Sequence, residues 1–164
     1  MIRCCIFDLD GTLLNTLDAL TYTTNLTLDE FGYGPVDPEH IKQFVGDGYR
    51  MQMKRALMYS GDKELLHYEE ALSAYTRLFA EHCLYHVRPY EGIPELLQEL
   101  KARGIRIAVL SNKPHARTVE NIEAVFGKGY FDIVAGQKDD VPKKPDPAGV
   151  NRILEEFGCK PEEC

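Results

Sequence analysis

Two aspartates separated by one residue follow an apolar run at the start of the sequence. The segment FDLDGTLLNT spans residues 7–16 and contains Asp8 and Asp10. The preceding run, MIRCCI, has the character of a strand buried on both faces of a parallel sheet. Two carboxylates this close are unfavourable unless a cation lies beside them. Because carboxylates offer hard oxygen atoms, the spacing indicates a Mg²⁺ site.

Polar residues also follow two later apolar runs. IRIAVLS, residues 105–111, is a second predicted strand and leads into Ser111 and Asn112. FDIVAG, residues 131–136, is a third predicted strand and leads into the lysine-rich segment KDDVPKKPDP. In an open parallel sheet, ligands bind beyond the carboxyl ends of the strands. We therefore expect the three polar groups to meet at one edge of the sheet.

Carboxylates, a hydroxyl, an amide and a lysine together suit phosphoryl transfer. That reaction needs a metal ion, positive charge for the phosphoryl oxygens and an aligned nucleophile. A carboxylate can be the nucleophile and form an aspartyl phosphate. A second carboxylate can protonate the leaving oxygen and afterwards activate water.

The apolar periodicity predicts an α/β fold. Strands that alternate with amphipathic helices imply a parallel sheet with right-handed crossovers. Strands are expected over residues 2–7, 105–111 and 131–136, and helical patterns lie within residues 16–32, 45–57, 68–83, 93–104, 114–126 and 147–157.

One block of the sequence is helical throughout and interrupts this alternation. It lies between the first strand and the first crossover helix, which is the position of an inserted lid or cap domain. We expect a core made of residues 1–14 and 87–164, and an all-helical cap made of residues 15–86 that is hinged at both ends.

The composition narrows the classes of partner. The net charge of −7 argues against nucleic acid or an anionic membrane as the main partner. No apolar stretch approaches the roughly 20 residues that span a bilayer. The five cysteines are odd in number and have no zinc-site spacing, which predicts reduced thiols and a cytoplasmic location.

Three short motifs carry a resemblance to a known family. DLDGT, VLSNK and KKPDP, in this order, resemble the first three motifs of the haloacid dehalogenase (HAD) superfamily. FVGDGYRMQMKRAL and RPYEGIPELLQELKARGIRIAVLSNK resemble its phosphoglycolate phosphatase-like branch. The resemblance covers essentially the whole chain, and it implies a Rossmann-like parallel sheet with an inserted helical cap.

The resemblance also implies roles for the first motif. Asp8 corresponds to the nucleophile and to a Mg²⁺ ligand. Asp10 corresponds to the general acid/base and supplies its backbone carbonyl to the metal, and this aspartate favours phosphoryl chemistry over dehalogenation. Gly11 lets the backbone turn sharply, and Thr12 helps to hold the motif and to bind phosphate.

The second and third motifs imply binding of the phosphoryl group. Ser111 and Asn112 correspond to phosphate-binding residues. Lys144 corresponds to the lysine of the third motif, and the neighbouring Lys143 is the less favoured candidate. In the alternative interpretation these residues form a turn, a helix cap and a solvated surface lysine.

Candidate substrate contacts in the cap are Gly46, Gly48 and Arg55. The two glycines are equally well explained as turn residues at the start of a helix. Arg55 suits a substrate carboxylate, but an ion pair within the cap explains it as well.

The sequence departs from the family at its end. The fourth motif, which supplies further acidic ligands for Mg²⁺, has no counterpart, since Glu162 and Glu163 lie too early to match it. We interpret the chain as truncated, with weakened Mg²⁺ binding and with turnover in doubt. Asp139 or Asp140 is the only substitute ligand that the sequence suggests.

The resemblance implies a Mg²⁺-dependent phosphatase acting on a small phosphorylated metabolite, with 2-phosphoglycolate the first substrate to test. Two alternatives stay open. A phosphotransferase such as a sugar phosphomutase shares the nucleophile. A catalytically dead binding module is favoured by the missing fourth motif and opposed by the intact DLDGT.

Overall fold

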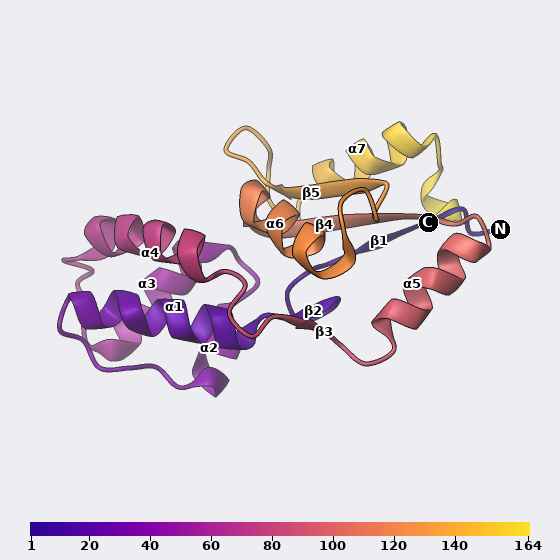
Figure 1. Ribbon diagram of the computed structural model, residues 1–164. Helices are drawn as coiled ribbons and strands as arrows, with labels where there is room; N and C mark the ends of the chain where they lie inside the picture. Colours follow the sequence, from indigo (N-terminus) through magenta and orange to yellow (C-terminus); the bar gives the residue numbers. More distant parts are fainter. The chain divides into compact units, whose positions relative to one another are not determined.

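The chain forms two compact units. The computed structural model describes residues 1–164 (Figure 1). One unit contains Met1–Asn15 and Arg88–Cys164 and is called here the sheet unit, and the other, Thr16–Val87, is called the helical unit. None of the helices in either unit is both long and apolar enough to cross a membrane.

The sheet unit contains the parallel sheet that the apolar runs predicted. Its strands are β1 (Cys4–Phe7), β4 (Arg106–Pro114) and β5 (Ile133–Gln137), in the spatial order β1-β4-β5. β4 pairs in parallel with both neighbours and is the central strand. The carboxyl ends of all three strands therefore lie at the same edge of the sheet.

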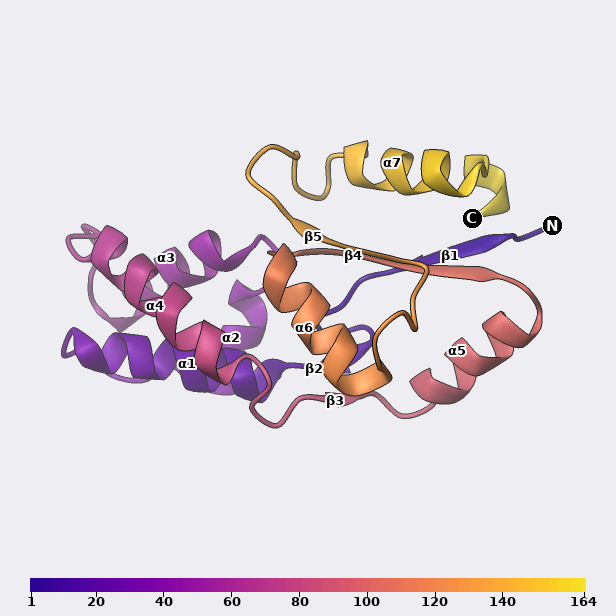
Figure 2. The same ribbon diagram turned by 45° about the horizontal axis from the view of Figure 1, so that its top comes forward.

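Helices cover both faces of this sheet. α7 (Ala148–Phe157) lies on one face, while α5 (Ile93–Ala102) and α6 (His115–Phe126) lie on the other (Figure 2). A short 3₁₀ helix, Pro161–Glu163, follows α7. The α/β class expected from the sequence is confirmed.

α7 is anchored by the apolar stripe that its sequence carries. Ile153, Leu154 and Phe157 are buried in one cluster with Cys4 of β1 and Ala108 of β4. Because these residues recur at i, i+1 and i+4, one side of the helix faces the sheet while its charged side faces solvent.

A two-stranded antiparallel pair lies where the chain leaves and re-enters the sheet unit. β2 (Leu14–Asn15) pairs antiparallel with β3 (Arg88–Pro89). Leu14 lies opposite Pro89, and Asn15 lies opposite Arg88. The sequence did not predict this strand pair because two-residue strands carry no detectable periodicity.

The helical unit is built around its own apolar core. Its largest fully buried side chains come from all four helices, namely Leu28, Ile41, Met53, Leu57 and Tyr75. The helices are α1 (Leu17–Glu30), α2 (Pro38–Phe44), α3 (Tyr49–Ser60) and α4 (Tyr68–His82).

α2 was not among the helices expected from the sequence, whose patterns leave residues 33–44 unassigned. The structure shows how this helix begins. The Asp37 side chain accepts a hydrogen bond from the His40 backbone N–H, and Pro38 takes the first helical position.

Candidate active site

The first motif forms a tight turn directly after β1. The backbone N–H groups of Thr12 and Leu14 both donate to the Leu9 carbonyl, at 3.2 and 3.1 Å. Gly11 has a φ of 77°, a conformation that L side chains rarely adopt. Leu9 is fully buried and anchors the turn, while Thr12 is exposed at its surface. The carboxylate of Asp8 is thereby held at the carboxyl edge of the sheet.

Asp8 is fixed through one oxygen only. Its Oδ1 accepts a hydrogen bond from the Leu9 N–H at 2.7 Å and lies 2.8 Å from the Lys144 Nζ. Its Oδ2 makes no hydrogen bond within the chain, and 45% of the side chain is exposed. The contacts of Oδ1 therefore fix the orientation of the carboxylate, and Oδ2 is the oxygen that can meet an incoming group.

The lysine-rich loop reaches Asp8 through Lys144. The Lys144 ammonium also donates to the Leu110 carbonyl of β4 at 2.9 Å. Two acceptors, one directly after β1 and one in β4, thus hold its position. Of the two adjacent candidates, Lys144 is the one whose ammonium is seen beside Asp8.

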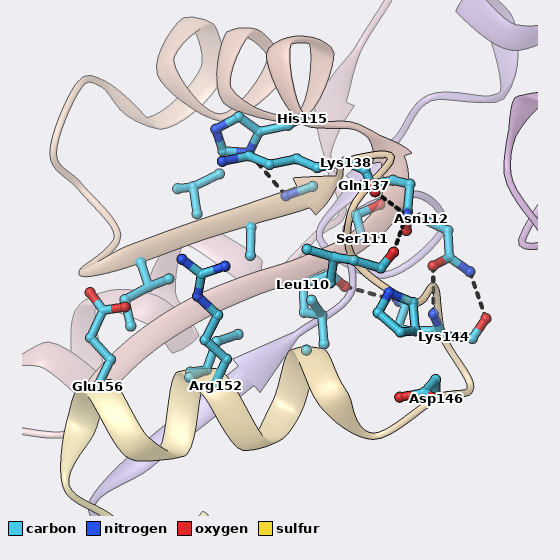
Figure 3. Close-up of a pocket in the computed structure, with 18 of the residues that line it drawn as sticks. Leu110, Ser111, Asn112, His115, Gln137, Lys138, Lys144, Asp146, Arg152 and Glu156 are labelled. Atoms are coloured by element: carbon cyan, nitrogen blue, oxygen red, sulfur yellow. Dashed lines mark hydrogen bonds between the residues drawn. The ribbon is translucent and has the colours of Figure 1, made fainter.

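Asn112 connects the end of β4 to the same loop. Its Oδ1 accepts from the Lys144 backbone N–H at 2.9 Å, and its Nδ2 donates to the Lys144 carbonyl at 3.1 Å (Figure 3). This two-way contact was not predicted, since the sequence suggested only a phosphate contact or a helix cap. Asn112 therefore fixes the backbone of the residue whose ammonium faces Asp8.

Ser111 lies beside Asn112 at the mouth of a cavity. Its hydroxyl oxygen accepts a hydrogen bond from the Lys113 backbone N–H at 3.2 Å. The cavity has a volume of about 340 Å³, lies between β4, β5 and α7, and has Ser111, Asn112 and Lys144 at one end (Figure 3). A small anionic group could enter there and meet all three side chains.

Lys113 was missed in the sequence interpretation. Its ammonium lies 2.9 Å from Oδ1 of Asp10, and only 2% of its side chain is exposed. A signal existed: a lysine that continues a buried strand needs a partner, and the carboxylates nearest in the fold are those of the first motif. The structure thus gives each aspartate of the motif its own lysine.

The cap candidates lie in the helical unit. Gly46 and Gly48 have φ values of 114° and 86°, as turn residues before α3 do. The Arg55 guanidinium donates to the Phe44 carbonyl at 2.9 Å and forms an ion pair with Asp47. Arg55 therefore braces the glycine loop, which is the alternative that the sequence left open.

The oxygens present fit a hydrated Mg²⁺ ion. Mg²⁺ binds one or two carboxylates and keeps several water molecules. The Asp8 carboxylate and the Asp10 carbonyl are oxygens of that kind. No group of three or more His, Cys, Asp or Glu side chains in the chain could hold a metal, so Asp139 and Asp140 complete no such group.

This arrangement agrees with the comparison of the sequence with known families. The profile of the haloacid dehalogenase-like hydrolases matches residues 5–164. The chain belongs to this family. The resemblance drawn from DLDGT, VLSNK and KKPDP is thereby confirmed.

Individual relatives agree with this assignment. A phosphoglycolate phosphatase from Thiobacillus denitrificans is 34% identical over 165 residues, which cover 99% of this chain and 72% of that protein. A predicted phosphoglycolate phosphatase from Haemophilus somnus has the same fold, with a TM-score of 0.91 at 24% identity, over 99% of this chain and 74% of that one. CbbY from Rhodobacter sphaeroides, solved in complex with phosphate, has a TM-score of 0.73 at 25% identity, over 99% and 76%. The chain is therefore a HAD-like hydrolase whose relatives include phosphatases.

Proposed function

We propose that this protein is a Mg²⁺-dependent phosphomonoester hydrolase that forms an aspartyl phosphate on Asp8. The proposal rests on how the two oxygen atoms of that carboxylate are held. Oδ1 is held by the Leu9 N–H and the Lys144 ammonium, while Oδ2 makes no hydrogen bond within the chain and 45% of the side chain is exposed. A nucleophile needs this combination of fixed orientation and an available oxygen.

The phosphoryl group of the substrate binds at the carboxyl ends of β1 and β4. Ser111 and Asn112 donate to its oxygens, with Thr12 beside them on the first turn. Lys144 supplies positive charge against the charge of the transferring group. In support, Ser111, Asn112 and Lys144 line one end of the same cavity.

In the first step, Asp8 Oδ2 attacks phosphorus and the bond from phosphorus to the substrate oxygen breaks. Asp10 gives the departing oxygen the proton that it took from water in the preceding turnover, so the substrate leaves as an alcohol. In the second step, Asp10 takes a proton from water, and the resulting hydroxide attacks phosphorus. Inorganic phosphate is released, and Asp8 returns as a carboxylate.

Lys113 acts in this scheme as a positioning residue. Its buried ammonium lies 2.9 Å from Asp10 Oδ1 and holds that carboxylate in one orientation. Asp8 and the Asp10 carbonyl would hold Mg²⁺, which supplies Lewis-acid charge to the phosphoryl oxygens.

The substrate class is a small phosphorylated metabolite, and 2-phosphoglycolate is the first compound to test. The name of the relative from Thiobacillus denitrificans supports this choice. The cap loop formed by Gly46, Asp47 and Gly48 is the proposed place for substrate selection, with Arg55 as its brace.

The test is release of inorganic phosphate from 2-phosphoglycolate, with and without Mg²⁺, by the wild type and by Asp8→Asn. The proposal expects release only from the wild type with Mg²⁺. Release that persists in Asp8→Asn contradicts the assigned nucleophile. A sugar phosphate that is isomerised without phosphate release would indicate a phosphomutase. Phosphate binding without turnover of any compound would indicate a binding module.

A further inference from the structure

A histidine that the proposed reaction does not use lies beside the candidate active site. His115 is the first residue of α6, is half-buried, and lines the same cavity as Ser111 and Asn112. Its imidazole Nδ1 accepts a hydrogen bond from the backbone N–H of Gly136 at 3.3 Å (Figure 3). His115 therefore links the start of α6 to the end of β5.

The contact with Gly136 fixes where the imidazole carries its proton. A backbone N–H can only donate, so the Nδ1 atom of His115 must offer its lone pair. The neutral ring therefore carries its hydrogen on Nε2. In the protonated ring both nitrogen atoms carry hydrogen, and two donors would then face each other. The hydrogen bond accordingly exists only while His115 is neutral.

The surroundings of His115 favour the neutral ring. Burial lowers the pKa of His115 below its usual 6.5, and the positive charge of Lys138 lowers it further. On α6 itself, Arg117 forms an ion pair with Glu120 at 2.7 Å. The other charged side chains that line the cavity are Asp132, Lys144, Asp146, Arg152 and Glu156.

Gly136 also packs closely against the end of β4. A Cβ added at Gly136 would lie 2.6 Å from the His115 Cα and 2.8 Å from the Lys113 carbonyl oxygen. The fully buried Thr118 donates from its hydroxyl to the same Lys113 carbonyl at 3.1 Å. The register between β4 and β5 shifts in this stretch, so a regular ladder does not hold it. The contacts of α6 and Gly136 hold it in addition.

This stretch of β4 carries residues of the proposed reaction. The Lys113 backbone N–H donates to the Ser111 hydroxyl oxygen at 3.2 Å, and the Lys113 ammonium lies 2.9 Å from Oδ1 of Asp10. A shift of the Lys113 backbone therefore moves a phosphate-binding hydroxyl and the proposed acid/base carboxylate together.

We infer that neutral His115 is a positioning residue for the proposed phosphatase. Through Gly136 it keeps Lys113 in place, and protonation of the imidazole releases that contact. Lys113 in turn carries the positions of Ser111 and Asp10. The kinetic consequence rests on the proposed function, whereas the contact itself can be tested without turnover.

Nuclear magnetic resonance of the isotope-labelled chain tests the contact. The other four histidines lie in the helical unit, so His115 is the only imidazole of the sheet unit. Between about pH 8 and pH 5, the amide signals of Gly136, Lys113 and Ser111 should shift in one step with the ring nitrogens of His115. His115→Asn offers a side-chain oxygen as acceptor but does not titrate, so this step should vanish.

The pH profile of phosphate release tests the consequence. In the wild type, kcat should fall by up to about 10²-fold as His115 becomes protonated, because misplaced groups lose that much. His115→Asn should keep its kcat to lower pH, while His115→Leu, which has no acceptor, should lose kcat at every pH. Lys138→Gln removes the neighbouring charge, so the pKa of His115 should rise and the wild-type fall should begin at higher pH. The substrate ionises identically with every variant, so differences between the profiles report on the protein.

Three results would overturn the inference. The first is a Gly136 amide signal that stays unchanged while the His115 ring titrates. The second is a His115→Asn profile that falls at the same pH as the wild type. The third is a His115→Leu variant with the kcat and the profile of the wild type. If the wild type releases no phosphate, the proposed function fails, while the amide signals still decide whether His115 holds Lys113.

Discussion

The ammonium of Lys113 lies 2.9 Å from the Asp10 carboxylate, although 103 residues separate the two in the sequence. The lysine side chain is 2% exposed and the aspartate side chain 15% exposed. A charge this deeply buried is tolerated only next to its partner. The pair therefore connects the first motif to the central strand and fixes the second aspartate.

Replacing Lys113 with Met should destabilise the protein. Methionine leaves the partly buried Asp10 carboxylate without its cation, at an expected cost of about 2–4 kcal/mol in the free energy of unfolding. Urea denaturation measures this cost. Lys128→Met, at an exposed position in the same unit, should change the free energy by less than about 0.5 kcal/mol. Equal effects of the two substitutions would show that the buried pair contributes nothing.

Replacing Lys144 with Met should reduce phosphatase activity far more than it reduces stability. Lys144 is 29% exposed, and its ammonium is placed for charge that develops on the phosphoryl group. Loss of one such group lowers kcat by about 10²–10³-fold. Steady-state phosphate release measures the effect, with the adjacent Lys143→Met as the matched control. If Lys143→Met gave the larger loss, the assignment of the third motif would shift by one residue.

Replacing Gly136 with Ala should disturb the junction between β4 and α6. An added Cβ would lie 2.6 Å from the His115 Cα and 2.8 Å from the Lys113 carbonyl, and it would also touch the Thr118 hydroxyl. Because two of these atoms are backbone, the strands must shift, at about 1–3 kcal/mol. Thermal unfolding reports the change. Gly34→Ala, where an added Cβ meets nothing within 4 Å, is the control and should leave Tm nearly unchanged.

Asp62 should make the helical unit sensitive to acid. Burial acts to raise the pKa of Asp62, but hydrogen bonds from the backbone N–H groups of His67 and Leu66 outweigh it and lower the pKa below the ordinary 3.8. The charged form is thus the stabilising form. Its contribution is complete above the unfolded pKa and is lost as the pH falls through the lower folded pKa.

Denaturation from pH 7 to pH 2 checks this prediction. Asp62→Asn should be less stable than the wild type at pH 7, and the difference should shrink below about pH 4. Asp29→Asn, at an exposed position of α1, should follow the wild type throughout. A stability difference for Asp62→Asn that does not change with pH would contradict the prediction.

The sequence predicted the parts of the fold that carry long apolar patterns. β1, β4 and β5 follow from continuous apolar runs, and α4 and α7 follow from stripes that recur every three to four residues. The structure extends β4 to Pro114, three residues beyond the predicted end, because strand geometry continues through the polar motif. α7 begins at Ala148, one residue later than expected, and Asp146 accepts a hydrogen bond from its first N–H.

The sequence could not predict the pairings within the candidate site. Residue types and strand ends indicated that Asp8, Asp10 and Lys144 would meet at one edge of the sheet, and in the structure Lys144 pairs with Asp8 while Asp10 pairs with Lys113. The contact of Asn112 with the Lys144 backbone depends on the path of a loop, which no periodicity encodes. The Lys113 pair was missed because the interpretation ended the strand at Ser111, two residues before Lys113.

The most direct test of the account is to trap the intermediate on Asp8. Borohydride reduces an acyl phosphate to an alcohol, so an aspartyl phosphate becomes homoserine at that position. The protein is mixed with 2-phosphoglycolate and Mg²⁺, quenched with borohydride and analysed by peptide mass spectrometry. The account predicts homoserine at position 8 only when substrate and Mg²⁺ are both present. Phosphate release with an unmodified Asp8, or with the label at another residue, would contradict it.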